Sequence, residues 1–226
     1  CGAVTLDANT TGDDNVAVGH GALGKNTTAD QNTAVGKNSM GENTTGTKNT
    51  AVGMNGLSSC TTGNNNVAVG RNALDALTTA SSNTAIGTEA LTANTASHNV
   101  ACGFATLESN TSGDSNTAVG SAALNANTTG TNNTALGRAA LDVNTTASNN
   151  TAVGSNALGA NTTGGENVAV GNGALDANTT ASNNVGVGVS AGGSVTTGSN
   201  NTAIGRSALA ANTTGSENTA MGKEAL

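Results

Sequence analysis

The feature that most constrains this chain is an internal repeat of 17 residues. Self-similarity at a fixed period is typical of solenoids and other repeat architectures. Successive repeats start 17 residues apart, except that Asn99 follows Asn83 after 16, and no segment lies outside the pattern. The repeats begin at Asn15, Asn32, Asn49, Asn66, Asn83, Asn99, Asn116, Asn133, Asn150, Asn167, Asn184, Asn201 and Asn218.

Positions within a repeat are numbered as slots, and the first asparagine is slot 0. Slot 1 is Thr or Val, slot 2 is Ala except at Gly186, and slot 3 is apolar in every repeat. Slot 4 is always Gly, and slot 8 is Leu except at Met40 and Gly192. Slots 11 to 14 usually read Asn-Thr-Thr-Gly or Asn-Thr-Thr-Ala. The repeat therefore combines a short apolar phrase, a glycine turn, one large apolar residue and a polar stretch.

Composition excludes a thick globular core. Phe104 is the single aromatic residue among 226, proline is absent, and 32 residues are glycine. Large aromatic and branched side chains fill the cores of conventional globular proteins, and one aromatic residue cannot fill such a core here. The glycines do not recur every third residue, which excludes collagen, and no long apolar run predicts a membrane-spanning helix.

These observations predict an all-β chain, a parallel β-solenoid of about 13 coils with 17 residues in each coil. Slots 1 to 3 form a short strand, the slot 4 glycine turns the chain with positive φ, and slot 8 returns a Leu to the core. Seventeen residues are too few for a strand-helix-strand crossover but suffice for one solenoid turn. We expect a single repeat domain over residues 1–226.

Strand alternation places slots 1 and 3 on one face of the strand and slot 2 on the other. Because slots 1 and 3 keep β-branched and apolar residues throughout, we expect them to point inward and the slot 2 alanines to point outward. An outward slot that never varies indicates close approach by a neighbouring chain. The alternative is that the alanines form a second, small interior layer within one chain.

Stacking turns each slot into a ladder along the solenoid. We expect the slot 0 asparagines to hydrogen-bond their own turn and the asparagines above and below. The polar slots 11 to 13 should form a second short strand or an arc. In the repeat from Asn116, the residues expected to form structural ladders are Asn116, Ala118, Val119, Gly120, Leu124, Asn127, Thr128 and Thr129.

Charged residues occupy the variable slots, which we expect to face solvent. Slot 5 carries the basic residues Lys37, Arg71, Arg138, Arg206 and Lys223. Acidic residues occupy slot 9 and slots 15 and 16. The net charge is −7 and there is no concentrated basic face, so nucleic-acid binding is not expected.

The phrase Thr/Val-Ala-Val/Ile-Gly resembles the head repeats of trimeric autotransporter adhesins. The full 17-residue form, as in residues 116–132, resembles repeats in phage and bacterial tail-fibre proteins. The resemblance covers the whole chain. It implies a left-handed β-roll, usually homotrimeric, that is exposed outside the cell or virion.

No catalytic or metal-binding pattern emerges, so we expect neither an enzyme nor a cofactor. His20 and His98 occupy irregular positions, and we interpret them as surface residues. Cys1 and Cys102 share slot 3 but lie six coils apart, too far to form a disulfide. All three cysteines, including Cys60 at slot 11, are interpreted as small apolar fillers. An N-terminal Cys-Gly could also mark a lipid anchor, but Cys1 falls in phase with an apolar slot.

The sequence predicts an extracellular structural or adhesive rod, on a cell or virion surface: a fibre shaft, adhesin head or filament subunit. Its expected partners are other copies, as a homotrimer or an end-to-end filament, and a surface receptor, glycan or matrix ligand. The chain begins at slot 3 and stops at slot 8, so both ends are predicted to be uncapped, which favours filament assembly. The alternative function is an ice-binding β-solenoid that uses a Thr ladder.

The repeat from Asn184 departs from the pattern. Gly192 stands in the Leu slot and Val195 in the slot 11 Asn position. We expect Val189 or Val195 to move inward there, or a cavity to remain. Replacing Gly192 with Leu should stabilise the coil if space exists, and destabilise it if the coil has repacked around the glycine.

Overall fold

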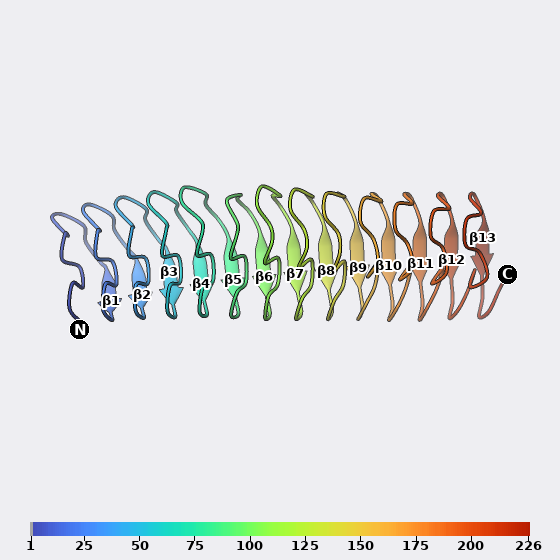
Figure 1. Cartoon of the computed structure of the whole chain (residues 1–226), viewed down its shortest axis with the longest axis horizontal. Helices are drawn as coiled ribbons and strands as arrows, with labels where there is room; N and C mark the ends of the chain where they lie inside the picture. The colour runs from blue at the N-terminus through green and yellow to red at the C-terminus, as the bar shows by residue number, and fades with distance from the viewer. Residues whose placement is uncertain (1) are drawn as a thin grey trace. The chain divides into compact units, whose positions relative to one another are not determined.

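A computed structural model describes residues 2–226, and within it all regular secondary structure is parallel β-strand. The chain divides into two compact units, Cys1–Asp114 and Ser115–Leu226. Each unit is a β-solenoid in which one three-residue strand recurs with each coil (Figure 1). The predicted fold class, an all-β parallel solenoid with about 17 residues per turn, is confirmed.

In the first unit each strand pairs in parallel with the next one along the chain. Register is kept residue for residue, so that Ala17 lies beside Ala34. The shorter repeat is absorbed outside the strands, because Thr84 still pairs with Val100. The strands of this unit are β1 (Val16–Val18), β2 (Thr33–Val35), β3 (Thr50–Val52), β4 (Val67–Val69), β5 (Thr84–Ile86) and β6 (Val100–Cys102).

The second unit repeats this arrangement, with parallel pairs in register from its first strand to its last. Its strands are β7 (Thr117–Val119), β8 (Thr134–Leu136), β9 (Thr151–Val153), β10 (Val168–Val170), β11 (Val185–Val187), β12 (Thr202–Ile204) and β13 (Thr219–Met221). Because the strands occupy slots 1 to 3 alone, the Asn-Thr-Thr stretch is an arc and not a second strand.

Left-handed backbone conformations turn the chain after each strand. The slot 4 glycine has the predicted positive φ, for example 129° at Gly120. A Cβ there would lie 2.5 Å from the carbonyl oxygen of Gly137 in the next coil, so glycine is also required by close stacking. Slot 8 is left-handed as well, with φ of 52° at Leu124, although this region is strained for a residue with a side chain.

The interior is thin and is built from small residues and one leucine per coil. Alanine at slots 2 and 7, leucine at slot 8 and asparagine at slots 0 and 11 are fully or almost fully buried through most of both units. The prediction that slot 8 enters the core is confirmed, since Leu124 has no exposed surface. Basic residues at slot 5, such as Arg138, are exposed as predicted.

The predicted orientation of the strand is wrong. Val119 at slot 3 is 39% exposed, whereas Ala118 at slot 2 is fully buried. Slots 1 and 3 therefore face outward and slot 2 faces the core in every strand. The side chains alternate as predicted, but the inward and outward faces are exchanged. The reason is space: a Cβ built on Gly56 at slot 7 would lie only 3.5 Å from the Cβ of Ala51, so slots 2 and 7 meet across a narrow interior.

The inference of a neighbouring chain from the slot 2 alanines is wrong for the same reason. Their size is limited by the opposite wall of their own coil, as the interior-layer alternative held. Ser39 at slot 7 illustrates the contact, because its hydroxyl donates a hydrogen bond of 3.0 Å to the carbonyl of Ala51. The alanine ladder thus says nothing about association.

The slot 0 asparagines form the ladder that was predicted. Each Oδ1 accepts the backbone N–H of the asparagine one coil later, as from Asn150 to Asn133 at 3.0 Å. Each Nδ2 donates to a slot 14 carbonyl near the end of its own repeat, as from Asn133 to Ala147 at 2.8 Å. Buried amides with these partners are satisfied.

Slot 11 carries a second asparagine ladder. The Nδ2 of Asn144 donates to Oδ1 of Asn127 at 3.0 Å and to the carbonyl of Ala147 at 3.1 Å. Slot 12 threonines extend the pattern on the surface, where the Thr128 hydroxyl donates to the carbonyl of Thr145 at 3.0 Å. Thr129 at slot 13 is exposed.

Candidate functional site

The outward face of the sheet is the first candidate surface. Slots 1 and 3 place two columns of Thr, Val, Ile, Leu, Cys and Met side chains on it, and no charged residue occupies either slot in any repeat. Exposure is high for apolar residues: Ile86 is 43% exposed in the first unit, and Val170 is 37% exposed in the second. Contiguous exposed apolar surface of this kind marks interaction sites.

Charges of opposite sign flank this face. Just before each strand, slots 15 and 16 hold six acidic residues and one lysine over the whole chain: Asp13, Asp14, Asp30, Asp114, Glu166, Glu217 and Lys48. Just after each strand, the charged residues at slot 5 are all basic. Two of the slot 5 arginines also pair with a glutamate of the following coil, Arg71 with Glu89 at 2.5 Å and Arg206 with Glu224 at 2.9 Å. Each unit therefore has an apolar face with an acidic rim at one edge and a basic rim at the other.

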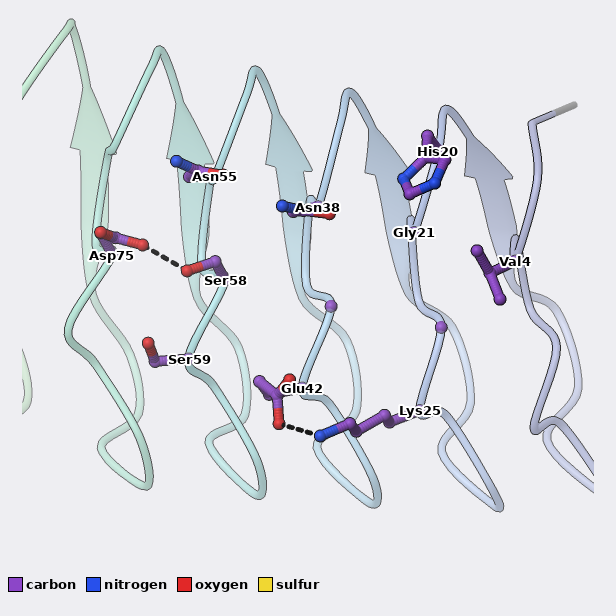
Figure 2. Close-up of a pocket in the computed structure, with 12 residues that line it drawn as sticks. Val4, His20, Gly21, Lys25, Asn38, Glu42, Asn55, Ser58, Ser59 and Asp75 are labelled. Atoms are coloured by element: carbon purple, nitrogen blue, oxygen red, sulfur yellow. Dashed lines mark hydrogen bonds and ion pairs between the residues drawn. The ribbon is translucent and has the colours of Figure 1, made fainter.

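A groove with a mixed polar and apolar lining in the first unit is the second candidate. It has a volume of about 550 Å³ and lies on slots 6, 9 and 10 of consecutive coils (Figure 2). Its lining residues are Val4, His20, Gly21, Gly24, Lys25, Asn38, Gly41, Glu42, Asn55, Ser58, Ser59 and Asp75.

Hydrogen bonds and an ion pair between successive coils fix some of the polar side chains of this groove. Lys25 and Glu42 form an ion pair of 2.6 Å at its lower side in Figure 2. The Ser58 hydroxyl donates to the carboxylate of Asp75. The groove therefore presents an ordered row of hydroxyl, amide and charged groups.

Residues 2–226 contain no cluster of potential metal ligands. No group of three or more His, Cys, Asp or Glu side chains within residues 2–226 is placed to hold a metal ion. His20 and His98 are both exposed, as interpreted from the sequence.

The cysteines differ in environment. Cys60 is buried at slot 11, as interpreted, and burial raises the pKa of its thiol to about 11. Its Sγ lies 3.7 Å from the carbonyl of Gly63, which it contacts as a weak donor. Cys102 lies half-exposed on the outward face of β6, so its interpretation as an interior filler is wrong. Both are free thiols. Cys1 lies outside the described residues.

One carboxyl group in the second unit is also perturbed. Partial burial raises the pKa of Asp142, and the positive charge of Arg138 opposes this shift. Asp142 lines a shallow cavity of about 370 Å³ with Gly159 and Asp176. This cavity occupies the same slots as the groove of the first unit.

The residues predicted to form ladders in the coil from Asn116 fall into three environments. Asn116, Ala118, Leu124 and Asn127 are interior, Gly120 forms the turn, and Val119, Thr128 and Thr129 lie on or toward the surface. Sequence reasoning missed the outward sheet face because it assigned slots 1 and 3 to the core. It also missed the groove, although consecutive slot 9 glycines at Gly24 and Gly41 were a visible signal.

The described residues include no helix with the length and apolarity needed to span a membrane. Comparisons of the chain with protein-family models, with curated proteins and with solved structures gave no match.

Proposed function

We propose that this chain is a non-enzymatic structural or adhesive element, exposed on a cell or virion surface, whose copies associate through the outward face of the sheet. The observation that carries this proposal is the uncharged double column at slots 1 and 3, with side chains such as Ile204 left 37% exposed. Covering these side chains would stabilise an assembly by about 25 cal/mol for each Å² of apolar surface removed from water.

The rims favour one relative orientation of the associated copies. When two sheets face each other with their solenoid axes parallel, the edge before the strands of one copy meets the edge after the strands of the other. The acidic rim then faces the basic rim. With antiparallel axes, like rims would meet, which is unfavourable. Parallel packing of two or three copies therefore fits the charge pattern.

Native mass measurement tests the assembly. Light scattering coupled to size exclusion should give a mass above that of the 21.4 kDa single chain. Val170→Lys should lower this mass, because it places an ammonium group in the apolar face. Thr180→Lys is the matched control, since Thr180 lies in the same coil at the exposed slot 13, and it should leave the mass unchanged. A wild-type mass of one chain at all concentrations would overturn the proposal.

Ice binding remains the second candidate, through the slot 1 threonines of the outward face. Thr117, Thr134 and Thr151 are adjacent in register on the outward face of β7, β8 and β9. They form a regular, half-buried Thr column. Against ice binding, the neighbouring slot 3 column mixes Val, Leu, Ile and Met, whose lengths differ. Thermal hysteresis of the wild-type chain that disappears in Thr134→Lys would favour this alternative.

A further inference from the structure

The groove of the first unit is hollow because two consecutive coils lack a slot 9 side chain. Gly24 and Gly41 stand where other coils carry residues such as Asp75 and Thr92. The backbone does not demand glycine at Gly41, since its φ lies outside the left-handed region. A Cβ built there would make ordinary contact, 3.5 Å from the carbonyl oxygen of Asn38. Folding therefore leaves this glycine unexplained, whereas an open groove explains it.

Unpaired hydrogen-bonding capacity lines the opening. Asn38 is exposed, and among residues 2–226 none makes a hydrogen bond with its side chain, which lies across Gly21. A Cβ on Gly21 would lie 2.8 Å from the Asn38 Oδ1, so this placement depends on the glycine. Asn55, one coil further, donates to Asn72 at 3.2 Å, and its amide is oriented along the same row (Figure 2).

The lining selects a class of ligand. Val4 is the one lining residue with a large apolar side chain, and polar groups interrupt the remaining apolar surface, so the groove does not suit a wholly apolar molecule. Lys25 compensates the charge of Glu42, so that Asp75 leaves the lining with one net negative charge, and this charge and the net charge of −7 disfavour phosphates and other anions. An extended peptide advances about 3.3 Å per residue against about 4.8 Å per coil, so it would lose register with the row. A neutral sugar offers hydroxyl groups that both donate and accept hydrogen bonds. The length of one sugar ring is similar to the spacing between successive coils, so successive rings can stay in register with the row.

The second unit shows the same construction independently. Two cavities of about 370 and 320 Å³ lie on slots 6, 9 and 10, and each contains a slot 9 glycine, Gly159 in one and Gly193 in the other. Asn156 and Asp176 line both. Cavities beside amide and carboxylate side chains therefore occur in both units where slot 9 is glycine.

We propose that the slot 6, 9 and 10 groove of the first unit is a binding site for a neutral oligosaccharide. The inference deepens the adhesive part of the function proposed above and rests on it. The site is separate from the outward sheet face, so that binding and assembly can be disturbed one at a time.

An array of immobilised neutral and acidic oligosaccharides tests the site with the full chain. We expect binding to neutral members, followed by titration of the best of them in solution. Gly41→Leu fills the groove and should weaken that affinity at least tenfold. Thr92→Leu is the matched control: Thr92 occupies slot 9 of a coil outside the groove, and its variant should bind like the wild type.

Asn38→Ala provides a second variant in case Gly41→Leu fails to fold. Alanine is compatible with this position, because Ala122 occupies slot 6 with a φ of 57°, close to the 55° of Asn38. Its affinity should also fall while its melting temperature stays near that of the wild type. Native masses recorded for every variant separate a lost sugar site from a lost assembly. Binding to no neutral member, binding to acidic members alone, or unchanged affinity in folded Gly41→Leu and Asn38→Ala would each overturn the proposal.

Discussion

The side chain of Leu175 occupies the space that a side chain at residue 192 would need. A Cβ built on Gly192 would lie 2.8 Å from the Cδ2 of Leu175, and one built on Gly186 would lie 2.9 Å from its Cγ. Val195, which replaces the slot 11 asparagine, is fully buried, whereas Val189 is 49% exposed. The coil from Asn184 has therefore packed around its two glycines, with Leu175 of the preceding coil filling the space beside them and Val195 in the buried slot 11 position.

This packing decides the effect of restoring leucine at slot 8. Gly192→Leu should destabilise the chain by about 1–3 kcal/mol, because it overfills a packed interior. Adding Val195→Asn restores the usual repeat and should recover part of the loss. Urea denaturation of both variants measures this coupling. A single Gly192→Leu variant more stable than the wild type would show that a cavity had remained.

The reversed strand orientation predicts unequal effects of truncation in one coil. Leu124→Ala should destabilise by about 2–5 kcal/mol, since it removes a fully buried side chain. Val119→Ala should lower the free energy of unfolding by less than about 1 kcal/mol, since Val119 faces outward. Denaturant unfolding at low protein concentration, where association is weakest, compares the two. Equal losses would contradict the outward assignment of slot 3.

The two asparagine ladders should differ in their tolerance of apolar residues. Asn133→Leu removes the acceptor of the buried Asn150 backbone N–H. This should lower the free energy of unfolding by about 1–3 kcal/mol, in addition to any effect of changed packing. Asn144→Leu should cost less, because slot 11 already accommodates Leu77 as a fully buried residue. Thermal and urea unfolding rank the variants. The ranking would be wrong if Asn144→Leu were the less stable of the two.

The buried thiol predicts a loss of stability in alkali. Burial raises the pKa of Cys60 from its ordinary 9.0 to about 11, so the unfolded chain releases this proton more readily than the folded one. The contribution of this protonated thiol to the free energy of unfolding is fully present below pH 9 and is lost as the pH rises through about 11. Melting temperatures across this range should therefore fall less in Cys60→Ala than in the wild type. A parallel decline in both would remove the thiol as the cause.

Thiol reactivity gives a second measurement on the same residue. In a background of Cys1→Ser and Cys102→Ser, Cys60 should resist a disulfide reagent at pH 8 until urea unfolds the chain, because it is fully buried. Rapid labelling of the folded protein would contradict that burial.

The sequence by itself determined the coil. Its period, the glycine at slot 4, the leucine at slot 8 and the recurrent asparagines identified a parallel solenoid whose strands pair in register. These features are local and recur in every repeat. Because each slot lies next to the equivalent slot of the following coil, the sequence of one repeat is enough to predict how the coils stack. The short repeat before Asn99 did not disturb this rule, because the missing residue falls outside the strands.

The tertiary structure alone decided which way the strand faces and where the surface is hollow. Alternation is symmetric, so Ala118 and Val119 were distinguishable only by the space opposite them, and the narrow interior accepts the alanine. The groove likewise depends on side chains from several coils that meet across the stack, such as Asn38 over Gly21. Facing direction and cavity shape are properties of the packed coils, and no single repeat specifies them.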